Sequence, residues 1–298
     1  MSGNEPAHLD PAAQAALHQP QEERIAFARQ LHYVPYTRAQ EALKVLADLL
    51  QHPRTPRMPN LLLVGESGNG KTTLLDRFRD LNPVTARPGG EALAPVIVMQ
   101  MPSEPSETRF WTELLFALHI AHRDTDPVQR KKNQAHSVLA YVGCRMLVID
   151  EFHNVLHGHA RQQRQFLAVL KNLSNDLRLP IVAAGTRDAV RTLHTDPQLS
   201  SRFEAFGLPR WKLDREFLRL LASFERFLPL EAPSELAGRE MAIRLHAMSE
   251  GTIGRLALTL TRAAAQAIRD RKSRIDRKIL DSAELVRLSD YGKLADVL

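Results

Sequence analysis

The stretch at 65–72 constrains the fold of this chain more than any other, because it reads G-E-S-G-N-G-K-T and fits G-x-x-x-x-G-K-[ST] at every position. An apolar run at 61–64 leads into it, and a helical pattern at 73–78 follows. A strand, a glycine-rich loop and a helix in this order form a phosphate-binding loop, in which backbone N–H groups and the helix N-terminus face the phosphates. The sequence therefore predicts a nucleoside triphosphate site, the alternative being a chance match on an ordinary strand–turn–helix.

The residues of this loop have separate predicted parts in holding ATP and Mg²⁺. Lys71 reaches the outer phosphates, and the Thr72 hydroxyl binds the metal ion. The residues predicted to bind the nucleotide are Gly65, Glu66, Ser67, Gly68, Asn69, Gly70, Lys71, Thr72 and Thr73.

A second part of the predicted site follows the apolar run at 146–149, which leads directly into Asp150 and Glu151. A carboxylate at the C-terminal end of a strand can hold the Mg²⁺ that bridges the phosphates, and Asp150 takes this part. Glu151, one residue on, can polarise the attacking water. Pairs of acidic residues are common in loops after strands. This pair indicates a catalytic site only because a phosphate-binding loop lies upstream of it.

Three further residues are candidates for a part in phosphate binding or hydrolysis, and some of them also have a purely structural interpretation. Thr186 follows the strand predicted at 181–184, where its hydroxyl could orient the water or cap the next helix. Arg202, in S-S-R-F, could stabilise the charge on the transferring phosphoryl group in a neighbouring subunit, or be one more surface arginine. Arg255 begins a helix near the C-terminus and could touch the γ-phosphate.

The order of the predicted elements indicates an α/β domain followed by a smaller helical one. The strand candidates lie at 61–64, 96–99, 146–149 and 181–184, with a short fifth at 206–211. They alternate with helical patterns, whereas the chain from 213 onward is helical throughout. We expect a flexible arm with a short helix at 1–32, a three-layer domain with a parallel sheet at 33–213, and a helical lid domain at 214–298.

Composition and charge narrow the class of protein. With 298 residues the chain can hold one large domain or two smaller ones, and its 44% hydrophobic and 25% charged content is that of an ordinary soluble protein. No apolar run is long enough to cross a bilayer, and the N-terminus lacks a signal-peptide layout. The single cysteine, Cys144, is compatible with a reducing cytoplasm, where we expect the protein. The net charge of +6 is a modest hint of a polyanionic partner.

Taken together, the motifs resemble those of AAA+ ATPases. The phosphate-binding loop is followed, in the AAA+ order, by L-V-I-D-E-F-H-N, P-I-V-A-A-G-T, Q-L-S-S-R-F and S-E-G-T-I-G-R. More specific phrases flank them: R-M-P-N-L-L-L-V-G, L-K-N-L-S-N-D-L-R-L-P-I-V and F-L-P-L-E-A-P-S. These look like the transposition ATPases called TniB and TnsC, with TniB the closer because long terminal extensions are lacking. The resemblance covers residues 33–288.

The resemblance implies roles for the matching residues, although asparagine is often found at the sensor-1 position in other AAA+ proteins. The implied roles are Walker A for Lys71 and Thr72, Walker B for Asp150 and Glu151, sensor 1 for Thr186, a finger offered to the next subunit for Arg202, and sensor 2 for Arg255.

The resemblance also implies an ATP-dependent homo-oligomer, a ring or a filament, on double-stranded DNA. Such an assembly marks a target and recruits a DDE transposase of the TniA or TnsB kind and a TniQ-like adaptor, with no membrane involved. Basic residues give this partial support, because Arg130, Lys131 and Lys132 form one cluster and the region 255–278 carries eight basic residues and two acids. Such residues make sequence-neutral phosphate contacts, although a basic helix can also be a solvated face.

Two other classes of ATPase stay open as alternatives. A protein-remodelling or clamp-loader-like AAA+ machine would grip a polypeptide with an aromatic and hydrophobic loop after the second strand, where this chain reads Q-M-P-S-E-P at 100–105. A small-molecule kinase shares the phosphate-binding loop, but it needs neither a finger arginine nor a helical lid of this length.

Overall fold

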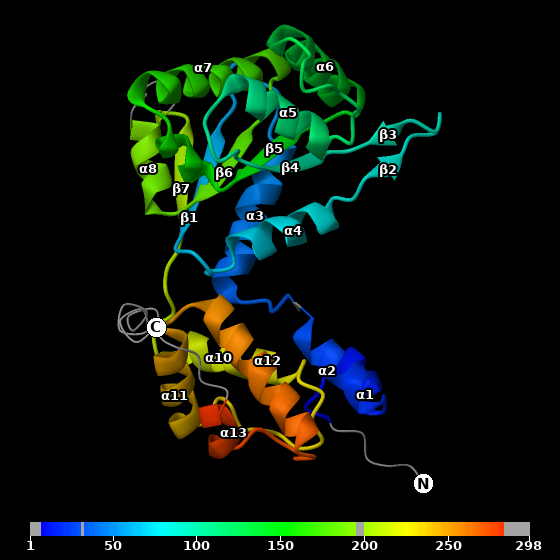
Figure 1. The fold of residues 1–298 in the computed structure, drawn as a ribbon, viewed down its shortest axis with the longest axis vertical. Coiled ribbons are helices and arrows are strands. Elements are labelled where there is room, and N and C mark those ends of the chain that lie inside the picture. Colours follow the sequence, from blue (N-terminus) through cyan, green and yellow to red (C-terminus); the bar gives the residue numbers. More distant parts are fainter. Residues whose placement is uncertain (1–6, 31–32, 195–199, 283–298) are drawn as a thin grey trace. The chain divides into compact units, whose positions relative to one another are not determined.

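A computed structural model describes residues 7–30, 33–194 and 200–282 of the chain. These residues form two compact units, one of residues 38–209 and one that combines the described residues before 38 with those after 209. The first is an α/β unit, and the second consists of helices (Figure 1).

The α/β unit is built on a parallel five-stranded sheet with the strand order β4-β5-β6-β1-β7. The strands are β1 (Asn60–Gly65), β4 (Val96–Gln100), β5 (Met146–Asp150), β6 (Ile181–Gly185) and β7 (Phe203–Leu208). Every residue of β5 and β6 is buried, which is why both appear in the sequence as uninterrupted apolar runs. The predicted parallel sheet is confirmed, although its last strand begins at Phe203 rather than Phe206.

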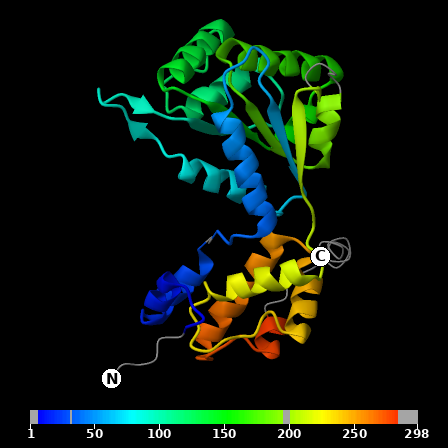
Figure 2. The ribbon, with the colours of Figure 1, turned by 180° about the vertical axis from the view of Figure 1, so that it is seen from behind.

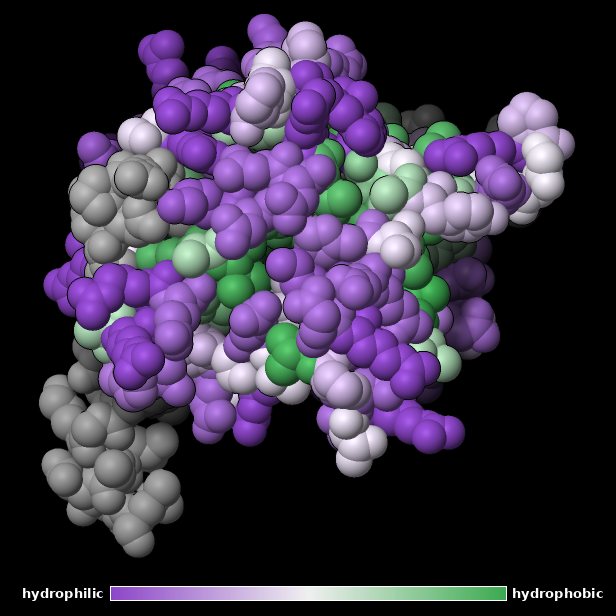
Figure 3. Space-filling view, turned by 90° about the horizontal axis from the view of Figure 1, so that it is seen from above, coloured by the Kyte–Doolittle hydropathy of each residue, from purple (hydrophilic) through white to green (hydrophobic). Residues whose placement is uncertain are grey.

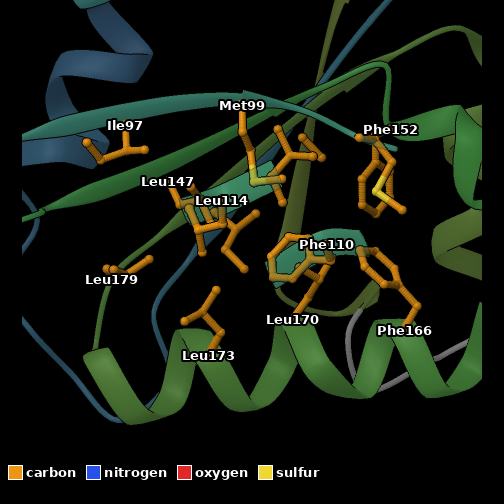
Figure 4. Close-up of a cluster of buried hydrophobic side chains, with 14 of the residues drawn as sticks. Ile97, Met99, Phe110, Leu114, Leu147, Phe152, Phe166, Leu170, Leu173 and Leu179 are labelled. Carbon is orange, nitrogen blue, oxygen red and sulfur yellow. The ribbon is translucent and has the colours of Figure 1, made fainter. Parts of the chain in front are cut away.

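Helices cover both faces of this sheet (Figures 1 and 2). They are α3 (Thr37–Gln51), α4 (Lys71–Leu81), α5 (Glu107–Ala117), α6 (Val128–Tyr141), α7 (Ala160–Leu177) and α8 (Arg187–His194), with a 3₁₀ turn, η1 (Phe152–His157), after β5. Helix α7 turns Phe166, Leu170 and Leu173 toward the strands, into a core that includes Met99 and Leu147 (Figure 4). This packing fixes the strands whose ends carry the predicted site.

A short antiparallel hairpin of β2 (Thr85–Ala86) and β3 (Ala92–Leu93) projects from the α/β unit (Figures 1 and 2). The face drawn in Figure 3 is mainly hydrophilic, and hydrophobic side chains show there in small patches. Among the described residues, no helix is both long and apolar enough to cross a membrane.

The helical unit contains two N-terminal helices, of which the second corresponds to the short helix predicted within 1–32 and the first lies where a flexible arm was expected. Its helices are α1 (Pro11–Leu17), α2 (Gln21–Arg29), α10 (Arg215–Glu225), α11 (Arg239–Ser249), α12 (Ile253–Arg269) and α13 (Arg277–Ser282). Ile25 and Ala28 of α2 are buried in the same core as Leu260 and Ala264 of α12. The Asp10 amide donates to a carbonyl of the segment after α10, at 2.8 Å. Helix α1 packs on α2, and α2 in turn packs on α12.

Candidate nucleotide-binding site

The carboxyl ends of three parallel strands bring the predicted catalytic residues to one edge of the sheet. Val64 of β1 lies beside Gly185 of β6, so the phosphate-binding loop and Thr186 begin at the same level. Ile149 of β5 lies beside Ala183 of β6, which sets Asp150 at that edge as well. In open parallel sheets, ligands bind at the carboxyl ends of the strands.

The phosphate-binding loop depends on backbone conformations that favour glycine. Gly68 and Gly70 have φ of 70° and 81°, in the left-handed region. The buried Asn69 side chain donates to the carbonyls of Leu208 and Pro209, at 2.7 and 2.9 Å, and so fastens the loop to the end of β7. In this structure Asn69 therefore acts through its side chain as an anchor of the loop, a contact that the sequence pattern does not reveal.

Lys71 lies at the start of α4 with its ammonium group turned into the loop. Its Nζ donates to the carbonyls of Gly65 and Glu66, at 2.9 and 3.0 Å, and only 5% of the residue is exposed. Burial lowers the pKa of Lys71, while the nearby Asp150 and Glu151 carboxylates act in the opposite direction. A buried cation surrounded by backbone dipoles is an environment that favours an anionic ligand.

Thr72 and Asp150 present adjacent oxygen atoms that suit Mg²⁺. The Thr72 hydroxyl donates to Asp150 Oδ2 at 2.6 Å, and Asp150 Oδ1 accepts the Glu151 amide at 2.8 Å. Mg²⁺ prefers such hard oxygen ligands and usually completes its shell with water and substrate phosphates. No cluster of three His, Cys, Asp or Glu side chains that could hold a metal occurs in the described part of the chain.

Glu151 is positioned by a neighbour that the sequence interpretation missed, His153. Glu151 has a φ of 54°, and its Oε2 lies 3.2 Å from His153 Nε2 in the η1 turn. The imidazole lies against the end of β6, because a Cβ at Gly185 would come within 3.2 Å of the His153 amide nitrogen and 3.4 Å of Nδ1. The only sequence signal for this arrangement is the spacing D-E-x-H after a buried strand, and it does not reveal the contact itself.

Thr186 and the residue after it lie at the rim of the site. The Thr186 hydroxyl makes no hydrogen bond to the described residues, so the helix-capping alternative gains no support. Arg187 Nη2 lies 3.6 Å from Glu66 Oε1 of the phosphate-binding loop, and this long ion pair links the ends of β1 and β6.

Arg202 lies at the other edge of the sheet. Its carbonyl accepts the amide of Asn60, the first residue of β1, at 2.8 Å, and its Nη1 donates to Asn175 Oδ1 of α7 at 2.7 Å. The six residues of β1 separate this edge from the phosphate-binding loop, a length of about 20 Å. Arg202 is therefore placed away from the phosphate-binding loop of its own chain.

Four predicted residues remain, Arg255, Arg130, Lys131 and Lys132. Arg255 is half-buried in the first turn of α12, in the helical unit, so its sensor role stays a prediction. Lys131 is 1% exposed and donates to Thr112 Oγ1 and the Asp124 carbonyl, at 3.0 and 3.1 Å. Its prediction as a DNA contact is wrong for this structure, because the fold uses its ammonium internally. Arg130 and Lys132 stay at the surface.

Comparisons with known proteins agree with this geometry. A family described as "Bacterial TniB protein" matches residues 24–213. No curated protein matches the chain in sequence.

Solved structures are similar to the chain in fold. The ORC2 protein of Aeropyrum pernix in ADPNP–ADP complexes has a TM-score of 0.60 at 17% identity, covering 87% of this chain and 71% of that one. The A. pernix ORC1 protein in complex with DNA has a TM-score of 0.56 at 18% identity, covering 87% of this chain and 68% of that one. The RuvB Holliday junction branch migration motor of Thermotoga maritima has a TM-score of 0.53 at 15% identity, covering 86% of this chain and 72% of that one. The fold is that of an AAA+ ATPase, as the sequence motifs predicted.

Proposed function

The chain belongs to the TniB family, and from this premise we propose that it is an ATP-dependent regulator of DNA transposition that oligomerises on duplex DNA. The observation that carries the proposal is the division of the site between two edges of one sheet. Lys71, Asp150 and Glu151 lie at the carboxyl edge, whereas Arg202 lies at the amino edge. A second subunit would complete the site, which couples ATP to assembly.

The chain's own residues supply most of the proposed chemistry. Bound ATP·Mg²⁺ supplies the phosphoryl group and the divalent charge. Lys71 binds the β- and γ-phosphates, and Thr72 and Asp150 hold the metal ion. Glu151 accepts a proton from the attacking water, which Thr186 orients, and Arg202 of the neighbour stabilises the charge on the transferring group. Arg255 is proposed to sense the γ-phosphate from the helical unit.

The partners follow from the family premise. ATP-bound subunits would form a ring or filament on DNA through sequence-neutral phosphate contacts, and hydrolysis would release them. The assembly would mark a target and recruit a DDE transposase and a TniQ-like adaptor. The A. pernix ORC1 protein, which shares the fold, was solved in complex with DNA, and this gives the proposal limited support.

A protein-remodelling or clamp-loader-like ATPase is the second candidate. The segment after β4 is unsuited to gripping a polypeptide. Met101 is buried, and its carbonyl accepts a hydrogen bond from the Asn154 side chain at 3.0 Å. The exposed residues that follow are Ser103 and Glu104, and Pro105 is buried. This segment therefore offers no aromatic side chain with which to grip an extended peptide.

Measuring ATP turnover and particle size with and without duplex DNA tests the proposal. We expect DNA to stimulate turnover and, with a non-hydrolysable ATP analogue, to produce large particles. The Lys71→Ala variant serves as the control and should lose nucleotide binding and assembly together. A wild-type protein that ignores DNA in both measurements would overturn the proposal, and stimulation by unfolded protein instead would favour the remodelling alternative.

A further inference from the structure

A basic concavity of about 650 Å³ lies in the helical unit, where three segments distant in sequence come together. Helix α2 contributes its last turn, α12 contributes its C-terminal half, and the third segment leads into α13. The cationic side chains that line it are Arg29, Arg262, Arg269, Lys272 and Lys278, and the acidic ones are Asp270 and Asp276.

The cationic and acidic side chains of this basic concavity differ in the contacts they make with the rest of the chain. None of its five cationic side chains forms an ion pair with the described residues. Both carboxylates, in contrast, accept hydrogen bonds from the chain, Asp270 from the Gln266 side chain and Asp276 from the Ile279 amide, each at 2.9 Å. The cations are therefore available to a ligand, whereas the acids already support the local fold.

Helix macrodipoles explain only some of these cations. Arg29 and Arg269 lie in the last turns of α2 and α12, and Lys272 follows α12 closely, where a positive charge is favoured. Arg262 lies about two turns before the end of α12, beyond the reach of that effect. Lys278 lies in the first turn of α13, where a cation is unfavourable. The macrodipole effect therefore does not account for these two residues.

We propose that the basic concavity binds backbone phosphates of duplex DNA. The proposal rests on the function proposed above, and it locates a contact that the family premise leaves open. Three of the five cations are arginines, whose planar forks bind phosphate oxygens in pairs. On α12, Arg262 and Arg269 are seven residues apart on one face, so they could follow successive phosphates of one strand.

An acidic peptide is a less fitting occupant. Peptide grooves offer apolar pockets for side chains. Here the apolar lining residues Ala265 and Ile279 are 2% and 5% exposed, so the accessible lining is mostly charged. A phosphodiester backbone needs charge and hydrogen-bond donors rather than apolar pockets.

The test is the double variant Arg262→Glu/Lys278→Glu, measured by fluorescence anisotropy on duplex DNA with a non-hydrolysable ATP analogue. Lys278→Glu puts an acid in a first helical turn, which favours folding. The matched control, Arg215→Glu/Arg239→Glu, changes two exposed arginines that begin α10 and α11 of the same unit. We expect the test variant to bind DNA at least about tenfold more weakly, with a salt dependence shallower by about two phosphate contacts.

Each outcome has a defined meaning. The control variant should bind DNA like the wild type, and nucleotide binding should be unchanged in both. Equal DNA binding by the test and control variants overturns this inference. It does so even if the test variant no longer binds a protein partner. If the wild-type protein itself shows no ATP-dependent DNA binding, the proposed function fails first, and the two failures are thus distinguishable.

Discussion

The contact between Glu151 and His153 is the feature of the site with the clearest consequence at the scale of single residues. Glu151 Oε2 lies 3.2 Å from His153 Nε2, and the carboxylate needs a fixed direction if it is to accept a proton from water. We predict that His153→Ala lowers kcat for ATP roughly tenfold or more, because small misplacements of a catalytic group are costly. The affinity for ATP should change little, since Lys71 and the loop are untouched.

The variant His153→Gln separates positioning from simple loss of packing. The side-chain amide of glutamine, unlike the methyl group of alanine, can still donate a hydrogen bond to the Glu151 carboxylate. The His153→Gln variant should therefore retain much of the turnover that His153→Ala loses. Stopped-flow nucleotide binding together with steady-state turnover provides the two readouts. A full rate for His153→Ala would show that Glu151 needs no such support.

At this scale the sequence predicts the residues whose spacing is local and misses those whose partners are distant. Lys71 and Thr72 belong to a motif of eight residues, so their positions follow from the pattern. The anchor from Asn69 to Leu208 spans 139 positions, and the burial of Lys131 depends on a hydrogen bond to Thr112 of another helix. Neither contact has a sequence signature, because each arises only when separate elements pack.

At the scale of elements, the N-terminal helix α2 corresponds to the short helix predicted for this stretch, and its packing on α12 is what the sequence did not show. Ile25 is 1% exposed and lies in the core of the helical unit with residues of α12. We predict that Ile25→Ala lowers the free energy of unfolding of that unit by about 2–5 kcal/mol, the usual cost of removing such a side chain from a core. Urea titration followed by circular dichroism measures the loss.

The control for this prediction is Glu22→Ala on the exposed face of α2. It should shift stability by no more than about 0.5 kcal/mol, as surface changes usually do. Equal effects of the two variants would show that Ile25 of α2 does not stabilise the helical unit. The buried strands were predictable because their apolar runs are continuous, whereas α2 buries only a narrow stripe.

At the scale of the whole molecule, the sheet order decides which residues one subunit can bring together. With β1 between β6 and β7, the phosphate-binding loop, Asp150 and Thr186 share the carboxyl edge, and Arg202 falls at the amino edge. The family resemblance implied that Arg202 acts on a neighbouring subunit, and this stays a prediction. The pairing of Asn60 with Phe203 places Arg202 a strand length away from the phosphate-binding loop of its own chain, as such a role would require.

Mixing two inactive variants tests whether Arg202 acts on a neighbour. Glu151→Gln subunits should bind ATP and assemble without hydrolysis, and Arg202→Ala subunits should bind ATP but lack the finger. In a mixed assembly, an intact site arises where a Glu151→Gln subunit offers its Arg202 to the site of an Arg202→Ala subunit. In an equal random mixture about a quarter of the interfaces have this arrangement, so we expect ATP turnover that neither variant shows alone.

The control is a mixture of Glu151→Gln with Thr186→Ala subunits, whose defects both lie at the carboxyl edge and leave Lys71 in place to bind ATP. No subunit in that mixture combines an intact Thr186 with an intact Glu151, so mixing should bring no gain in ATP turnover. Recovery in the first mixture and not in the second requires a site shared between subunits, because only then does a defect in Arg202 belong to the neighbour. If the first mixture also stays inactive, or if Arg202→Ala alone hydrolyses ATP at the wild-type rate, Arg202 is not the residue that a neighbour supplies.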